Sequence, residues 1–133
     1  MAGERILVVD DNPTNVKLLS FLLSSRGYQV ESAGDAEEAL RLLEGYRPDL
    51  ILMDIQLPGM DGLALTRRLR AEPATRDVVI VAVTAHAMRG DEDRALEAGC
   101  DGFITKPVDT RSFPATIAEH LARRRAPRGG APP

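Results

Sequence analysis

The stretch "RILVVDDNPTN" (residues 5–15) places four apolar residues directly before two adjacent aspartates and a proline. The run from Ile6 to Val9 predicts a strand that is buried on both faces, as in a parallel sheet. Asn12 can cap a helix that begins at Pro13, because the first helical residue needs no N–H. The stretch therefore predicts a strand, an acidic pair at its carboxyl end and then a helix.

The same order of strand and helix recurs along the chain. Further strands are predicted at residues 28–33, 49–54, 78–84 and 102–105. Helices are predicted from residue 13 towards Gly27, from Asp35 to Gly45, through 65–69, over 91–98 and over 112–124. Asp35 and Glu38 form a candidate capping box for the second helix. Pro114 falls in the first turn of the last helix, where it costs no hydrogen bond if Ser112 or Phe113 is the cap and one if Thr110 is.

This alternation predicts an α/β fold, in which a five-stranded parallel sheet is covered by helices on both faces. Right-handed crossovers leave two usual strand orders. A five-stranded chain of this length favours the doubly wound, flavodoxin-like (βα)5 order 2-1-3-4-5. The first and third strands are then neighbours, and ligands of such sheets bind beyond the carboxyl ends of the strands at this point.

The composition predicts one globular domain. The chain has 133 residues, of which 44% are hydrophobic and 28% charged. Its single cysteine, Cys100, excludes an internal disulfide and favours a reducing, cytoplasmic location. We expect Cys100 to be a half-buried small residue. No apolar run approaches the eighteen or so residues that a membrane span needs, so no membrane insertion is expected.

The charge of the chain is distributed unevenly. The formal net charge is −3, but the last eleven residues, "RRRAPRGGAPP", carry four of the seventeen basic residues. The remaining body is therefore clearly acidic, which argues against direct binding to nucleic acid. Residues 123–133 are expected to form a disordered, basic, Pro/Gly-rich tail beside a domain at 1–122. The tail could attract an anionic partner or simply be solvated.

Three aspartates are expected to meet at one edge of the sheet. Asp10 and Asp11 follow the first strand, and Asp54 ends the third. These two strands are predicted neighbours, and adjacent strands lie about 4.8 Å apart. Unpaired carboxylates at that distance repel and raise one another's pKa, and a divalent cation relieves this cost. Oxygen ligands without histidine or cysteine select Mg²⁺ or Mn²⁺. The alternative is that Asp10 and Asp11 only cap the first helix.

Three further residues are predicted at the same edge. Thr84 ends the fourth strand and Ala85 follows it, while Lys106 follows the fifth strand. Lys106 is one of only two lysines in the chain, and its ammonium can pair with a carboxylate or a phosphoryl oxygen. A cis bond to Pro107 would help to aim it, although only about 5% of X–Pro bonds in folded proteins are cis.

These motifs together resemble the receiver domain of two-component response regulators. The matching pieces are "ILVVDDN" (6–12), "DLILMDIQLPGMDG" (49–62), "VTA" (83–85) and "KP" (106–107), and the resemblance covers about residues 5–122. The wording "DDNPTNVKLL" looks closest to single-domain regulators and to receivers of hybrid kinases. The resemblance implies a phosphoacceptor protein in a two-component system or phosphorelay.

The resemblance also implies roles for residues of the acidic cluster. Asp54 would be the phosphoacceptor that attacks a phosphohistidine. Asp11 would bind Mg²⁺ directly, and Asp10 mainly through water. The backbone carbonyl of Gln56 would be another metal ligand. Gln56 and His86 are at the positions that tune dephosphorylation in the family, although His86 could equally be an exposed spectator.

The remaining implied roles concern the phosphoryl group and the conformational switch. Thr84, the Ala85 N–H and Lys106 would bind phosphoryl oxygens, with Pro107 orienting the lysine. Phe103 would be the switch aromatic that turns inward when Thr84 moves.

Partner proteins are implied on two surfaces. A histidine kinase or a histidine phosphotransfer protein would dock near Pro13, Val16 and Pro107. A downstream protein would bind the face of the fourth helix, fifth strand and fifth helix, for which the candidate residues are Met88, Arg94, Thr105 and Ile117.

Two other functions compete with a phosphorylation switch. One is a pseudo-receiver scaffold that binds its partner without phosphorylation. The other is a Mg²⁺-dependent phosphatase with an aspartate nucleophile, but Gln56 stands where that mechanism wants a second acid. We therefore do not expect an enzyme beyond catalysis of its own phosphorylation and slow self-dephosphorylation.

Overall fold

The sheet has five parallel strands in the order β2-β1-β3-β4-β5, as the sequence predicts. The computed structural model describes residues 3–57, 59–85 and 90–124. The strands are β1 (Arg5–Val9), β2 (Gln29–Ala33), β3 (Leu50–Asp54), β4 (Val79–Thr84) and β5 (Gly102–Thr105). The helices are α1 (Pro13–Ser24), α2 (Ala36–Leu42), α3 (Gly62–Ala71), α4 (Asp91–Ala98) and α5 (Phe113–Arg124).

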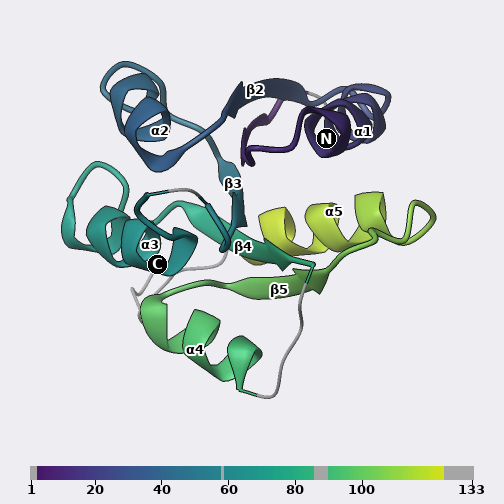
Figure 1. Cartoon of the computed structure of the whole chain (residues 1–133). Coiled ribbons are helices and arrows are strands. Elements are labelled where there is room, and N and C mark those ends of the chain that lie inside the picture. The colour runs from purple at the N-terminus through teal and green to yellow at the C-terminus, as the bar shows by residue number, and fades with distance from the viewer. Residues whose placement is uncertain (1–2, 58, 86–89, 125–133) are drawn as a thin grey trace.

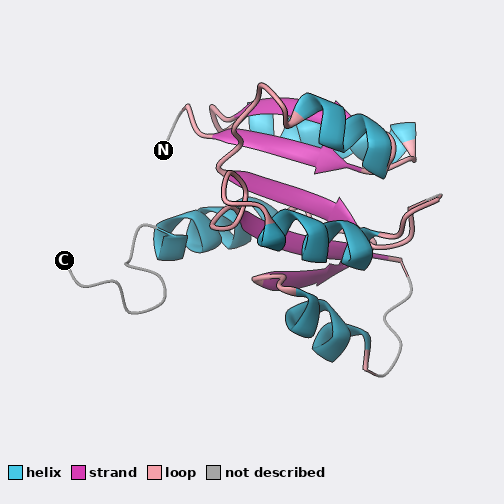
Figure 2. Cartoon of the chain, turned by 90° about the vertical axis from the view of Figure 1, so that its left-hand side faces the viewer, coloured by secondary structure: helices cyan, strands magenta, loops and turns pink. Residues whose placement is uncertain are grey.

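The helices form a layer on each face of the sheet. Figure 1 shows α1 and α5 on one side of the strands and α2, α3 and α4 on the other. The strand arrows all run the same way, so their carboxyl ends share one edge (Figure 2). Alternate residues of β1 enter opposite cores: Ile6 and Val8 join the α1/α5 side, whereas Leu7 and Val9 join the other. Full burial of β3 and β4 agrees with their apolar runs at 50–53 and 79–83, each of which ends in one polar residue.

The helix starts are set largely by the residues that the sequence indicates. The Asn12 side chain accepts the N–H groups of Thr14 and Asn15 at 2.9 and 3.3 Å, and Pro13 is the first residue of α1. Asp35 Oδ1 accepts the Glu38 N–H at 2.8 Å, which confirms it as the cap of α2. The return bond differs slightly from the usual capping box, because Glu38 Oε1 accepts from Gly34 at 2.8 Å.

The last helix begins where Pro114 costs nothing. The Ser112 carbonyl accepts the Thr116 N–H at 3.0 Å, and Phe113 is the first helical residue. This agrees with the Ser112 alternative and not with Thr110. The helix continues through Arg124, so the first two residues of the predicted tail are helical. Residues 125–133 lie outside the described residues, and their disorder stays a prediction.

One arginine joins the helices α3 and α4 to the sheet. Arg70 Nε donates to the Gly99 carbonyl at 2.9 Å, and Nη1 donates to the carbonyls of Arg76 and Val78 at 2.8 and 2.5 Å. Arg70 Nη2 lies 2.8 Å from Asp101 Oδ2, which also accepts the Ile80 N–H at 2.9 Å. The guanidinium thus ties α3, the start of β4 and the end of α4 together.

Cys100 lies beside this arginine and is buried, with 5% of its surface exposed. The sequence predicts it half-buried, so the structure corrects that estimate. Its Sγ lies 3.8 Å from Thr66 Oγ1, and burial raises the pKa of the thiol. In the described part of the chain, the helices are too short or too polar to cross a membrane.

Candidate functional site

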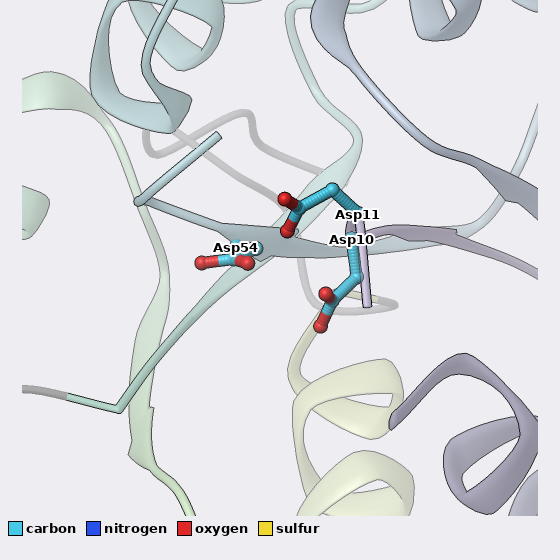
Figure 3. Close-up of side chains that lie close together, drawn as sticks. All are labelled: Asp10, Asp11 and Asp54. Atoms are coloured by element: carbon cyan, nitrogen blue, oxygen red, sulfur yellow. The ribbon is translucent and has the colours of Figure 1, made fainter. Parts of the chain in front are cut away.

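The three predicted aspartates converge at the carboxyl edge of the sheet. Asp10 and Asp11 follow β1, and Asp54 ends the neighbouring strand β3 (Figure 3). Each offers one carboxylate oxygen, and these oxygens all lie within 4.8 Å of one another. Asp10 and Asp54 are 3% and 4% exposed, whereas Asp11 faces solvent. The site therefore has two fixed, buried carboxylates and one accessible carboxylate at its mouth.

Asp54 is held at the centre of this cluster. Its Oδ1 accepts the Gln56 N–H at 2.9 Å, and its Oδ2 lies 3.5 Å from Lys106 Nζ. Burial raises the pKa of Asp54, and the charges of Asp10 and Asp11 act in the same direction. The Gln56 N–H and Lys106 oppose this effect without overcoming it. A cation beside the cluster would favour the ionised form.

Lys106 reaches the cluster from the end of β5. Its Nζ lies 3.2 Å from Asp10 Oδ2, so the ammonium is placed between Asp10 and Asp54. Its backbone N–H donates to the Thr84 carbonyl at 2.7 Å, which joins it to the end of β4. The Lys106–Pro107 peptide is cis, which is the rarer of the two isomers that the sequence allows.

Asp10 has partners that the sequence did not predict. Its Oδ1 accepts the Asn12 N–H at 2.9 Å, and its Oδ2 accepts from Asn15 Nδ2 at 2.5 Å. Asn15 lies in the first turn of α1, so the helix that starts beside the acidic pair turns a side-chain amide back towards it. Helical spacing from the cap at Asn12 places Asn15 in the first turn of α1, but the contact also depends on how the helix is rotated relative to β1.

Gly62 is a second residue whose importance the sequence understates. A β-carbon at Gly62 would come within 2.4 Å of the Asp54 carbonyl oxygen. The Gly62 N–H also donates to the Ile55 carbonyl at 3.3 Å. The first residue of α3 therefore packs directly against the backbone that carries Asp54.

The other predicted site residues occupy the following positions. Thr84 is fully buried at the end of β4, and Ala85 after it is exposed. Phe103 is partly buried and packs against the core beneath α2, α3 and α4. Gln56 and Pro107 are exposed. His86, proposed to tune dephosphorylation, lies outside the described residues.

The predicted docking surfaces need one correction. On the face of α4, β5 and α5, Arg94 and Thr105 are exposed, but Ile117 is completely buried among the residues beneath α1 and α5. The sequence predicts the helix but not its rotation, which turns Ile117 into this core. Met88 lies outside the described residues. Near the cluster, Pro13 is exposed and Val16 partly buried.

The donor set fits a hard divalent cation. The three clustered side chains all offer carboxylate oxygens, which Mg²⁺ prefers over the softer ligands that zinc or copper take. Two of the three carboxylates are more than nine-tenths buried, so their mutual repulsion is poorly screened by water. The cluster is therefore suited to a small cation with part of its hydration shell.

Comparison with known proteins shows similarity to response regulators. The sequence profile of the response regulator receiver domain matches residues 6–118. The polar-differentiation response regulator DivK of Brucella anthropi is 42% identical over 116 residues, which cover 87% of this chain and 94% of that protein.

Solved structures show the same similarity. The chain superposes on a CheY-like response regulator receiver domain protein from Methanospirillum hungatei with a TM-score of 0.85 and 32% identity, covering 92% of this chain and 97% of the other. The receiver domain of the sensor histidine kinase PA1611 from Pseudomonas aeruginosa gives a TM-score of 0.82 and 38% identity, over 91% and 99% of the two chains. That structure has a magnesium ion coordinated in its active-site cleft.

Proposed function

The chain belongs to the response regulator receiver domain family of two-component signalling, and we propose that Asp54 is its phosphoacceptor and Mg²⁺ its cofactor. The observation that carries the proposal is the convergence of Asp10, Asp11 and Asp54 within 4.8 Å, with Lys106 Nζ 3.5 Å from Asp54. Similarity to a receiver domain with magnesium in its cleft supports the choice of metal.

The proposed reaction transfers a phosphoryl group from a phosphohistidine. An Asp54 carboxylate oxygen forms a bond to phosphorus as the P–N bond breaks, and the electron pair of that bond stays on the imidazole nitrogen. Such a transfer needs an in-line nucleophile and positive charge near the equatorial oxygens. Lys106 supplies a positive charge, and the Thr84 hydroxyl and the Ala85 N–H supply hydrogen bonds.

The metal-binding role falls to the acidic cluster. We assign the metal to Asp11 directly, to Asp10 through water, to Asp54 and to the Gln56 carbonyl. A Mg²⁺ ion held by these residues would supply positive charge to the phosphoryl oxygens. The Gln56 N–H holds Asp54 Oδ1 at 2.9 Å and so fixes the orientation of the nucleophile. We assign Pro107 to orienting Lys106.

Phosphorylation is proposed to change a protein-binding surface. Thr84 would move towards the phosphoryl group, and Phe103, which is only partly buried, would turn inward. This would alter the face formed by α4, β5 and α5. A histidine kinase or histidine phosphotransfer protein would approach near Pro13 and Pro107.

A cytoplasmic location of the protein also stays a prediction.

The phosphoacceptor is tested by incubating the protein with acetyl phosphate and Mg²⁺ and measuring its intact mass. We expect one phosphoryl adduct, which is absent with EDTA and absent in Asp54→Asn. An adduct that persists in Asp54→Asn would place the acceptor elsewhere. No adduct on a folded protein that binds Mg²⁺ would instead support a pseudo-receiver that binds its partner without phosphorylation.

A further inference from the structure

Asn15 contacts the acidic cluster although the proposed chemistry assigns it no role. Its Nδ2 lies 2.5 Å from Asp10 Oδ2, and a carboxylate oxygen accepts hydrogen bonds, so the amide donates. The same oxygen lies 3.2 Å from Lys106 Nζ. Asn15 and Lys106 are therefore two donors on one oxygen of Asp10.

In the proposed reaction Lys106 has to move towards the phosphoryl group, whereas Asn15 does not. Lys106 Nζ lies 3.2 Å from Asp10 and 3.5 Å from Asp54, so it is shared between them. To pair with a phosphoryl oxygen on Asp54, the ammonium must loosen its contact with Asp10. The Asn15 amide belongs to the first turn of α1, so it would stay beside Asp10 if the lysine moved.

The departure of Lys106 would be costly without a second donor. Asp10 is 3% exposed, and a buried carboxylate that loses a hydrogen-bond partner is strongly destabilised. Asn12 serves only the other oxygen, Oδ1, through its backbone N–H. Among the donors described around Asp10, Asn15 is the one that shares Oδ2 with the lysine.

We propose that Asn15 is a positioning residue, which holds the Asp10 carboxylate while Lys106 shifts from Asp10 to the phosphoryl group on Asp54. This inference rests on the proposed function and deepens it. It assigns a task to a side chain one helical turn from the acidic pair. Without the amide, Lys106 would remain more tightly paired with Asp10 and would be less available to the phosphoryl oxygens.

A purely structural role for Asn15 makes a different prediction. The Asn15 backbone N–H is capped by Asn12 Oδ1 at 3.3 Å whatever side chain stands at position 15. A side chain that only stabilised the start of α1 would change the melting temperature but would act independently of Lys106. Coupling between Asn15 and Lys106 therefore distinguishes the two roles.

The test uses beryllofluoride with Mg²⁺ as a phosphoryl mimic and measures its affinity by calorimetry on the full chain. Asn15→Ala and Asn15→Asp are compared with Thr14→Ala, an exposed neighbour in the same turn. Each is made with Lys106 intact and in a Lys106→Ala background. Mg²⁺ affinity without beryllofluoride and the melting temperature are measured in parallel.

With Lys106 present, we expect both Asn15 variants to weaken beryllofluoride binding by about five-fold or more, and Thr14→Ala to stay within about two-fold. In the Lys106→Ala background the effect of Asn15→Ala should fall below about two-fold, because no ammonium has to be released. Equal effects in the two backgrounds, or none with Lys106 present, would overturn the inference. If the unmodified protein binds Mg²⁺ but neither takes a phosphoryl group nor binds the mimic, the proposed function fails, and the inference fails with it.

Discussion

Gly62 shows how closely the backbone around the phosphoacceptor is packed. A β-carbon there would meet the Asp54 carbonyl oxygen at 2.4 Å and the Ile55 α-carbon at 2.6 Å, and both are backbone atoms that cannot turn aside. The absence of a side chain thus lets α3 begin directly against the end of β3. The position of Asp54 depends on a residue that carries no functional group.

Gly62→Ala is expected to lower the free energy of unfolding by about 1–3 kcal/mol, the usual cost of overpacking. It should also weaken Mg²⁺ binding, because the backbone beside Asp54 must shift. Chemical denaturation and calorimetry measure the two effects. Gly45→Ala is the matched control, since a β-carbon there would have no atom within 4 Å. Equal behaviour of the two variants would contradict this account of Gly62.

Single residues differ in how well the sequence predicts them. Asp10, Asp54, Thr84 and Lys106 could be placed because each follows or ends a strand, and the strand order brings those ends together. The contact of Asn15 could not be predicted, because it depends on the phase of α1 relative to β1. The burial of Ile117 depends in the same way on the rotation of α5, which a sequence pattern indicates less directly than the helix itself.

At the scale of elements, the end of α4 is anchored by an arginine of α3. Gly99 ends the helix with φ of 113°, and its carbonyl accepts from Arg70. The start at Gly90 has no side-chain cap. The predicted limits of α4, residues 91–98, were correct. α2 ends at Leu42, before the predicted Gly45. The residues after it form a turn, in which the Gly45 N–H donates to the carbonyl three residues back, that of Leu42, at 3.3 Å.

Arg70→Met is expected to lower the free energy of unfolding by about 2–4 kcal/mol, because it leaves Asp101 and three carbonyl groups without a shared donor. Hydrogen exchange should accelerate most around the α4–β5 junction. Arg67→Met, at an exposed position of the same helix, is the control and should change stability little. A uniform acceleration across the sheet would argue against a local anchor.

For the whole molecule, the buried charge of Asp54 lowers the free energy of unfolding of the metal-free protein. Burial raises the pKa of Asp54 in the folded protein above its value in the unfolded chain. Between those two pKa values the folded state binds more protons, so the free energy of unfolding falls as pH rises through this window. Above the window the full cost of the buried charge is present.

Asp54→Asn should therefore raise the melting temperature of the metal-free protein at about pH 7, because the amide carries no charge to bury. The difference should shrink as pH is lowered through the raised pKa of Asp54. Added Mg²⁺ should stabilise the unmodified protein more than the variant. Thermal unfolding in EDTA and in Mg²⁺ across the pH range measures all three effects. A variant no more stable than the unmodified protein in EDTA at about pH 7 would contradict the prediction.

The rate at which the buried thiol of Cys100 is labelled can report on local opening of the protein. It is the only cysteine, it is 5% exposed, and its raised pKa keeps the reactive thiolate scarce. Because Cys100 is buried against Thr66, we expect a thiol-specific dye to react with it mainly when this packing opens. The labelling rate therefore measures how often this part of the protein loosens, and a cysteine introduced on the surface would be labelled first.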